Sequence, residues 1–256
     1  MVILIMSKNF ILGIGLEFEG AWNDLPNEFF NNHVYRNDGS ISDLNENVCD
    51  ICHKSKRRHI DDQISHTFEP MSRNDEHTYY NFVGEIASKP FLSKTGMLMN
   101  CTKWAIKYTP IDFNASCSAH LHFSIRNDLQ YYLLNSKKFF KHFYNCLDYW
   151  LETRSIDKKS NFYKRVKGVN PQGIHGMNYC KKTFMPYDVK NKDEASSRYN
   201  GINFCKNKHN TIEIRIGTPF KDGYIMADYI KFCFDIINGF IARNYKPINI
   251  VRKFEI

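Results

Sequence analysis

Short stretches of the chain alternate apolar and polar residues with a period of two, the pattern of a strand that buries one face. The alternation is clearest in residues 119–123, where His120 and His122 flank Leu121. Turn-forming residues, such as those at 37–40, separate stretches of this kind. We therefore predict strands at residues 10–19, 34–41, 82–87, 118–125, 202–205 and 211–217.

Two long segments instead repeat their apolar residues at helical spacing. The first spans residues 128–153, with Asn127 or Asp128 as its N-cap. Its apolar face comprises Leu129, Leu133, Phe140, Phe143, Leu147, Trp150 and Leu151. The second spans residues 225–243, and its apolar face comprises Tyr229, Phe232, Cys233, Ile236, Ile237 and Phe240. Residues 93–108 are also predicted to be helical, whereas residues 158–197 are expected to be loop-rich.

Strands that neighbour one another in sequence and are followed by helices are typical of an α+β domain with an antiparallel sheet. We expect a curved antiparallel sheet of about six strands, with helices packed on one face. A chain of 256 residues is long enough for one large core, and no linker divides it. We therefore expect one domain over residues 1–256, with an inserted loop region at about residues 42–83 that is polar and has no clear period.

The composition is that of an ordinary globular protein, with 43% hydrophobic and 24% charged residues. Lys and Arg exceed Asp and Glu by 35 to 27, and this surplus favours anionic partners without choosing among nucleotides, acidic small molecules and nucleic acid. Most of the eight cysteines stand singly in apolar runs, which indicates a reducing compartment. No apolar run has the length of a signal-peptide core or a membrane span. We expect a cytoplasmic protein without a membrane partner.

Three predicted strands carry pairs of chemically active side chains at positions i and i+2. The pairs are Glu17 with Glu19, His120 with His122, and Glu213 with Arg215. Because side chains alternate along a strand, each pair lies on one face and the apolar residue between lies on the other. Glu85 begins a similar pattern in residues 85–88. One face of the sheet is therefore expected to be core, and the other to gather carboxylates, imidazoles and a guanidinium.

Each pair alone is weak evidence of a site, because antiparallel sheets commonly expose one face to water and cross-strand ion pairs are common. The joint occurrence of three pairs in separate strands is more specific. Carboxylates with histidine, and without a cysteine cluster, are hard ligands that suit Mg²⁺ or Mn²⁺. The added arginine indicates a metal-bound polyphosphate, whose transferring phosphoryl group needs positive charge around it.

Several short motifs follow one another in a particular order. They are Gly15-Leu16-Glu17-Phe18-Glu19, Asp38-Gly39-Ser40, Glu85-Ile86-Ala87-Ser88-Lys89-Pro90, His120-Leu121-His122, Arg198-Tyr199-Asn200-Gly201-Ile202-Asn203 and Thr211-Ile212-Glu213-Ile214-Arg215. Their order, over about residues 12–220, resembles the amidoligase family, whose carboxylate–amine ligases share the catalytic fold of glutamine synthetase and glutamate–cysteine ligase. The resemblance implies a glutamine-synthetase-like catalytic domain. It also implies an ATP-dependent ligase that forms an amide, peptide or isopeptide-like, through an acyl-phosphate intermediate.

The resemblance further implies roles for the acidic residues and one histidine. Glu19 and Glu85 would hold one Mg²⁺ or Mn²⁺ ion. Glu17, His120 and Glu213 would hold a second ion that bridges the nucleotide phosphates. The implied cofactors are thus ATP and a divalent metal.

The remaining motif residues are implied to serve the reacting groups. His122, Arg215 and Arg198 would contact the phosphates or the developing acyl phosphate. Asp38 and Ser40 would lie near the amine or carboxylate substrate, which could be a small molecule or a peptide. Nucleic acid is not expected as a partner of such a ligase.

Two features differ from the family pattern. Ser118-Ala119 stands where the family usually has a glycine before its histidine pair, and the segment from residue 42 to residue 83 is longer than the family needs. Within that segment Cys49 and Cys52, with the histidines that follow them, could bind Zn²⁺, although their spacing is irregular. Two other functions stay open: a two-metal phosphodiesterase or nuclease, and a zinc-containing nucleic-acid-binding module.

Overall fold

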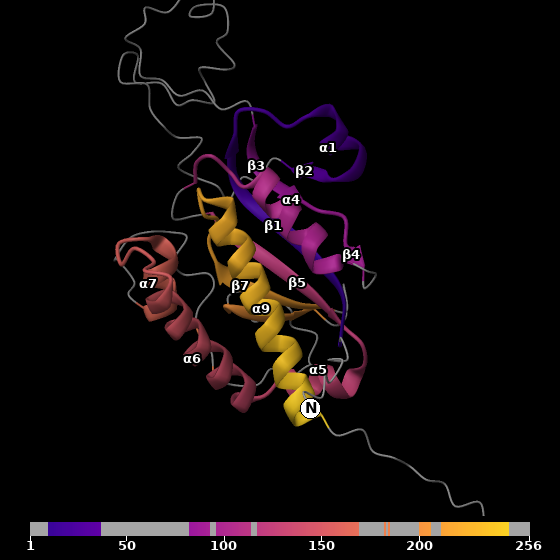
Figure 1. Ribbon diagram of the computed structural model, residues 1–256, viewed down its shortest axis with the longest axis vertical. Helices are drawn as coiled ribbons and strands as arrows, with labels where there is room; N and C mark the ends of the chain where they lie inside the picture. Colours follow the sequence, from indigo (N-terminus) through magenta and orange to yellow (C-terminus); the bar gives the residue numbers. More distant parts are fainter. Residues whose placement is uncertain are drawn as a thin grey trace, which may run out of the picture.

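The computed structural model of the chain describes residues 10–36, 82–92, 96–113, 117–168, 182, 184, 200–205 and 211–245 (Figure 1). The strands are β1 (Ile11–Trp22), β2 (Val34–Arg36), β3 (Phe82–Ala87), β4 (Phe91–Leu92), β5 (Ala119–Ile125), β6 (Ile202–Cys205) and β7 (Thr211–Gly217). The helices are α1 (Asn27–Asn32), α4 (Met97–Tyr108), α5 (Asp128–Leu134), α6 (Lys137–Thr153), α7 (Asn161–Lys167) and α9 (Gly223–Asn244).

The described strands form one open, seven-stranded sheet in the order β2-β3-β1-β5-β7-β6, with β4 paired to β1. Neighbouring strands in this order run antiparallel. The long strand β1 lies in the middle and pairs with β3 over one half and with β5 along most of its length. The predicted α+β class with an antiparallel sheet is confirmed. The two-residue strand β4 and the short helix α1 were not predicted.

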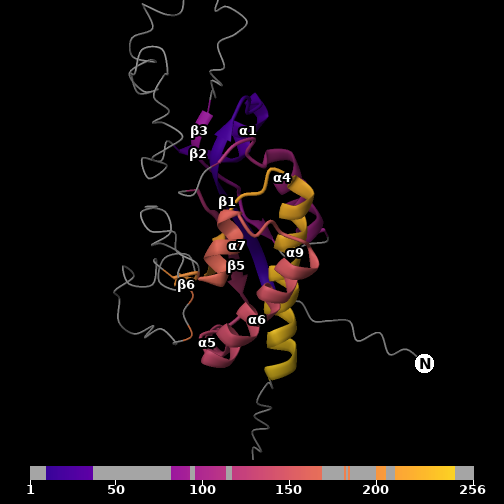
Figure 2. The ribbon, with the colours of Figure 1, turned by 90° about the vertical axis from the view of Figure 1, so that its left-hand side faces the viewer.

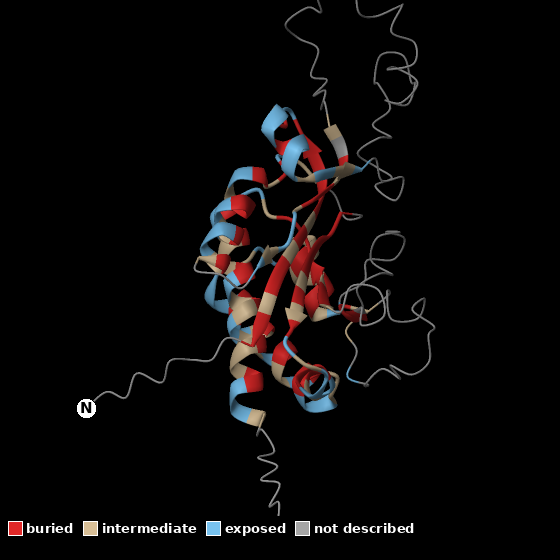
Figure 3. Ribbon diagram, turned by 90° about the vertical axis from the view of Figure 1, so that its right-hand side faces the viewer, coloured by how far each residue is buried: buried red, intermediate tan, exposed pale blue. Residues whose placement is uncertain are grey.

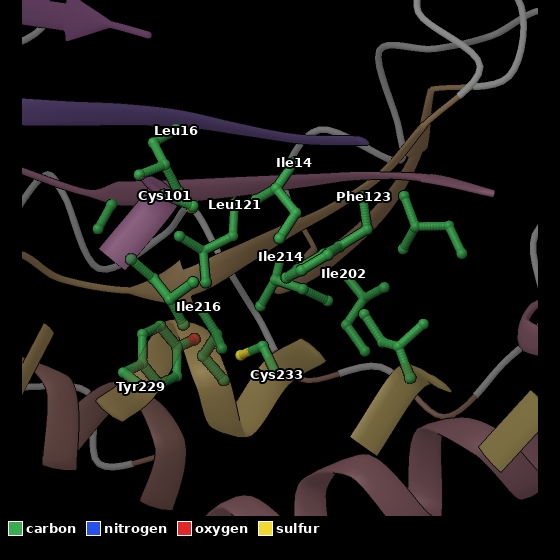
Figure 4. Close-up of a cluster of buried hydrophobic side chains, with 14 of the residues drawn as sticks. Ile14, Leu16, Cys101, Leu121, Phe123, Ile202, Ile214, Ile216, Tyr229 and Cys233 are labelled. Atoms are coloured by element: carbon green, nitrogen blue, oxygen red, sulfur yellow. The ribbon is translucent and has the colours of Figure 1, made fainter. Parts of the chain in front are cut away.

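One face of the sheet is the hydrophobic core. Leu16, Leu121 and Ile214 are almost completely buried and belong to one cluster with Cys101 of α4 and with Tyr229 and Cys233 of α9 (Figure 4). Helices α4 and α9 lie along this face of β1 and β5 (Figure 2). Because neighbours on a strand point to opposite faces, the residues flanking Leu16, Leu121 and Ile214 lie on the other face.

Helices α4 and α9 also pack against each other. Their buried residues form stripes that face the sheet, while their outer sides are exposed (Figure 3). The close approach depends on Gly223, because a Cβ atom there would lie 2.8 Å from the Cα atom of Ile106. Among the helices described, none combines the length and the apolar character needed to cross a membrane.

The prediction of one continuous helix over residues 128–153 is wrong. The segment forms α5 and α6, and Ser136 between them caps α6 by accepting a hydrogen bond from the backbone N–H of Phe139 at 3.2 Å. A serine oxygen that satisfies an otherwise unpaired N–H favours a new helix start over continuation of the old helix. Leu129, expected on the buried face, is 60% exposed. The expected cap Asn127 does accept a hydrogen bond from the N–H of Gln130.

Residues 158–197, predicted to be loop-rich, contain the helix α7. The hydroxyl of Ser160 accepts a hydrogen bond from the N–H of Tyr163 and starts this helix, and Gly168 ends it with a left-handed backbone at φ +69°. Seven residues with two buried apolar anchors, Phe162 and Val166, are too few to show a helical period in the sequence. The helix matters because it carries a buried arginine, Arg165.

Candidate metal centre

The register of three central strands brings the predicted side chains together on the face opposite the core. Glu17 on β1 pairs with His120 on β5, and His122 on β5 pairs with Glu213 on β7. Directly paired residues point to the same side of an antiparallel sheet and lie within side-chain reach of each other. Two carboxylates and two imidazoles therefore converge from strands that are far apart in the sequence.

Glu17, His122 and Glu213 form a group that could hold a metal ion, because their ligand atoms all lie within 4.8 Å of one another. The Nε2 atom of His122 lies 3.5 Å from Glu17 Oε2 and 3.8 Å from Glu213 Oε1. Gly15 pairs with His122, and a Cβ atom at Gly15 would lie 3.4 Å from the Cβ atom of His122 and crowd it. Two carboxylates and one imidazole fit a hard divalent cation such as Mg²⁺ or Mn²⁺.

His120 lies beside this group and is buried, with 5% of its surface exposed. Its Nδ1 atom lies 3.4 Å from Glu17 Oε2 and 3.4 Å from Glu213 Oε1. Its Nε2 atom is buried without a hydrogen-bond partner among the described residues. The family resemblance gives His120 to the metal and His122 to phosphate. The structure places both imidazoles against the two carboxylates, and it is His122 that falls in the compact three-residue group.

Polar neighbours orient the ligands. The Oε2 atom of Glu213 accepts a hydrogen bond from Asn203 Nδ2 at 2.8 Å, and its Oε1 atom accepts one from Arg215 Nη1 at 2.6 Å. The Nδ1 atom of His122 lies 3.3 Å from the hydroxyl oxygen of Thr211. Such partners fix the direction of a metal-binding side chain and tune its affinity. Asn203 and Thr211 both lie in the quoted motifs, but neither was predicted to support a ligand.

A β-bulge sets the position of Arg215. The register of β7 against β5 shifts between Ala119 and Leu121. On the other side of β7, the backbone N–H groups of Arg215 and Ile216 both donate to the carbonyl oxygen of Gly201, at 2.8 and 3.1 Å. Two consecutive N–H groups on one acceptor are the mark of a bulge, which bends a strand and turns its side chains. The guanidinium lies on the same face as the carboxylate two residues before it, which it contacts at 2.6 Å.

A second acidic pair lies next to the first group on the same face. Glu19 on β1 pairs directly with Glu85 on β3. The Oε2 atom of Glu19 accepts a hydrogen bond from the N–H of Ser118 at 2.6 Å. Glu85 accepts one from Arg36 Nη1 at 3.1 Å. Arg36 is the directly paired residue on β2, and it was not predicted because strand pairing, rather than any local motif, places it there.

The charges in the site act strongly on one another. Burial alone would raise the pKa of Glu17, but hydrogen bonds with His120 and His122 outweigh it and hold that pKa far below its usual range. Burial likewise opposes ionisation of Glu213, yet the charges of His120 and Arg215 lower its pKa. For His120, burial and Arg215 act to lower the pKa, and the carboxylates Glu17 and Glu213 raise it overall. These interactions favour the ionised forms of Glu17 and Glu213 and the protonated form of His120.

Glu85 differs in this respect from Glu17 and Glu213. Burial, followed by the charge of Glu17, raises its pKa above the usual range. A carboxyl group with a raised pKa in a site crowded with acids is one that a cation would stabilise in its charged form.

Some predicted residues lie outside the described part of the chain. They are Asp38, Ser40, Arg198, Cys49 and Cys52. Most of the expected insertion, residues 42–81, also lies outside it, while residues 82–83 belong to β3 and not to the insertion.

The described geometry can therefore hold a divalent cation between two carboxylates and an imidazole, with a second acidic pair and two arginines at its edges. Comparison of this chain with known family models, with curated proteins and with solved structures returned no match.

Proposed function

We propose that this chain is an ATP- and Mg²⁺-dependent carboxylate–amine ligase that forms an amide through an acyl phosphate. The observation that carries the proposal is the convergence of Glu17, His122 and Glu213 within 4.8 Å on one face of an antiparallel sheet. The direct pairing of Glu19 with Glu85 beside them supplies a second cluster of acids. The resemblance of the motif order to amidoligases gives these side chains their proposed chemistry.

The residues divide into those that would bind the metal ions and those that would contact the phosphates or the substrates. Glu17, Glu213 and one of the two imidazoles would hold one cation, and Glu19 with Glu85 would hold the other. A bound divalent ion would neutralise the charge that builds on the phosphate oxygens of ATP during transfer. Arg215 would turn from Glu213, which it contacts at 2.6 Å, toward those oxygens once a cation balances the carboxylate. Arg198 would add a further positive charge, and Asp38 and Ser40 would meet the substrates.

Phosphoryl transfer is needed because a carboxylate is a poor electrophile. Its resonance and negative charge both resist attack by an amine, so one oxygen must first become a leaving group. Transfer of the γ-phosphoryl group gives an acyl phosphate, which the amine then attacks with release of inorganic phosphate. Arg215 lies at the edge of the site beside Glu213, and its positive charge would stabilise the γ-phosphoryl group during transfer.

The test begins with binding. Calorimetric titration with Mn²⁺, and with Mg²⁺ plus ATP, should give saturable binding that Glu213→Gln abolishes. The control Asp228→Asn lies on α9 away from the acids and should bind as the natural protein does. Absence of metal binding by the natural protein would overturn the proposed function.

The second step identifies the reaction. The protein is incubated with labelled ATP, pooled amino acids and amines, and the products are read by mass spectrometry. Amide formation with release of ADP and phosphate supports the proposal, whereas release of AMP and pyrophosphate contradicts the acyl phosphate. Cleavage of DNA or RNA without use of ATP would instead identify a two-metal phosphodiesterase.

A further inference from the structure

Arg165 is a buried cation that the proposed chemistry does not use. It lies on α7, and 6% of its surface is exposed. An arginine side chain stays charged at any physiological pH, so burying it is costly unless its N–H groups find acceptors. The hydrogen-bond acceptors of Arg165 therefore indicate which part of the structure the buried guanidinium stabilises.

The guanidinium group joins two strand ends. Its Nη1 atom donates to the hydroxyl oxygen of Ser118 and to the carbonyl oxygen of Gly217, both at 3.1 Å, and its Nη2 atom donates to the carbonyl oxygen of Cys117 at 3.1 Å. Cys117 and Ser118 lead into β5, and Gly217 ends β7. These are the two strands that carry the histidine pair and the Glu213–Arg215 pair. The guanidinium presents these donors as a planar fork, from two separate nitrogen atoms, and so reaches acceptors on both strand ends, whereas an ammonium group donates every N–H from a single nitrogen atom.

Ser118 passes this restraint on to a predicted metal ligand. The N–H of Ser118 donates to Glu19 Oε2 at 2.6 Å, and the N–H of Glu19 donates to the carbonyl oxygen of Ser118 at 3.0 Å. The carboxylate of Glu19 is thus fixed by the backbone segment to which Arg165 donates hydrogen bonds. Ser118 links the guanidinium to the carboxylate.

We infer that Arg165 is a positioning residue, which acts through Ser118 to hold the Glu19 carboxylate in the geometry that a metal ion needs. The inference rests on the proposed function, because it takes Glu19 as a metal ligand. Outer partners of this kind commonly change metal affinity by about 10- to 100-fold when they are removed. The role makes α7 part of the site although it offers no ligand itself.

The experiment uses the full chain with Arg165→Lys, which keeps the charge but not the fork, and Ser118→Ala, which removes one acceptor but keeps the N–H that Glu19 accepts. Amide hydrogen exchange is measured first, because it needs no metal. Relative to the amide of Phe123 within β5, the Ser118 amide should exchange about 10-fold faster in Arg165→Lys, which corresponds to about 1.4 kcal/mol of lost local protection. Unchanged relative exchange in both variants would overturn the inference.

Mn²⁺ affinity is measured on the same variants. Arg165→Lys should weaken the binding that depends on Glu19 by about 10-fold or more, and it should cause no further loss when Glu19→Gln is already present. Independent, additive losses, or faster Ser118 exchange with unchanged affinity, would show a purely structural arginine. Arg154→Lys is the matched control, because Arg154 bonds Asp228 at 2.6 Å and should leave both readouts unchanged. If the natural protein binds no Mn²⁺, the proposed function fails and the exchange result alone decides the link between Arg165 and Ser118.

Discussion

The Nδ1 atom of His120 lies 3.4 Å from Oε2 of Glu17, although 103 positions separate the two residues in the sequence. The same atom lies equally close to Glu213, so one buried imidazole is held between carboxylates from the two strands on either side of its own. A proton on His120 balances the charge that a metal ion would balance in the loaded site. Protons and metal ions are therefore expected to compete there.

We predict that acidification stabilises the metal-free protein and weakens its response to metal. The carboxylates raise the pKa of His120 above 6.5 against the effects of burial and Arg215, so its stabilising contribution is complete below that value and is lost as the pH rises through the raised pKa. The increase in melting temperature caused by millimolar Mg²⁺ should grow over the same interval. Thermal melts from about pH 5.5 to about pH 8.5, with and without Mg²⁺, measure both trends. His120→Gln should flatten them, and an Mg²⁺ shift that is equal at every pH would contradict the competition.

Glu85→Gln is predicted to stabilise the metal-free protein near neutral pH. Burial and the charge of Glu17 disfavour the ionised form of Glu85, so its removal should add about 0.5–1 kcal/mol to the free energy of unfolding. The gain should vanish near pH 4, where the natural side chain is itself protonated. Chemical denaturation at both pH values measures the difference. Arg36→Gln removes the cation that faces Glu85 and should lower the free energy of unfolding. A Glu85→Gln protein that is less stable than the natural one would argue against an unfavourable ionised Glu85.

Leu121→Ala should lower the stability of the protein without removing its response to Mg²⁺, because the core and the candidate metal centre lie on opposite faces of the sheet. The side chain is completely buried, and its truncation should lower the free energy of unfolding by about 2–5 kcal/mol. The rise in melting temperature on adding Mg²⁺ should nevertheless persist, because the flanking histidines lie on the other face. Ile214→Val, with an expected cost of about 0.5–1.5 kcal/mol, is the milder companion. Loss of the Mg²⁺ effect in a protein that still unfolds cooperatively would show that the faces are coupled.

Arg215→Gln should lower the rate of the proposed reaction more than the affinity for ATP. The guanidinium contacts Glu213 at 2.6 Å and would meet the phosphoryl oxygens as their charge builds. We expect kcat to fall by about 100-fold or more with a small change in the KM for ATP. Steady-state kinetics with the identified substrate pair measure both constants. A raised KM with unchanged kcat would mean that Arg215 holds ATP equally in the ground state and the transition state.

The period of two along three strands was enough to predict which side chains share a face. Leu121 lies in the core while His120 and His122 meet the carboxylates, as the alternation required. Strand pairing could not be deduced in the same way, since one sequence does not state which residue stands opposite which. Arg36 was missed for this reason, and Asn203 was quoted as a motif residue without a role, because each belongs to the site through its partner on the next strand.

Local signals also competed within the predicted helices. The apolar spacing of residues 128–153 favoured one helix, but the side chain of Ser136 bonds the N–H of Phe139 and starts a second. The apolar pattern measures burial and says little about where a backbone hydrogen bond changes partner. Arg165 escaped notice because a basic residue in a short polar stretch looks solvated until its acceptors are known.

The bulge in β7 gives its two charged side chains separate supports. Glu213 is aligned by its pairing with His122 on β5 and with Asn203 on β6, whereas the backbone N–H of Arg215 donates to the carbonyl oxygen of Gly201 just before β6. A change in the bulge would therefore alter the position of the Arg215 guanidinium more than that of the Glu213 carboxylate, which both neighbouring strands align. Substitutions that change the bulge could therefore shift the guanidinium of Arg215 while the metal-binding side chains stay the same.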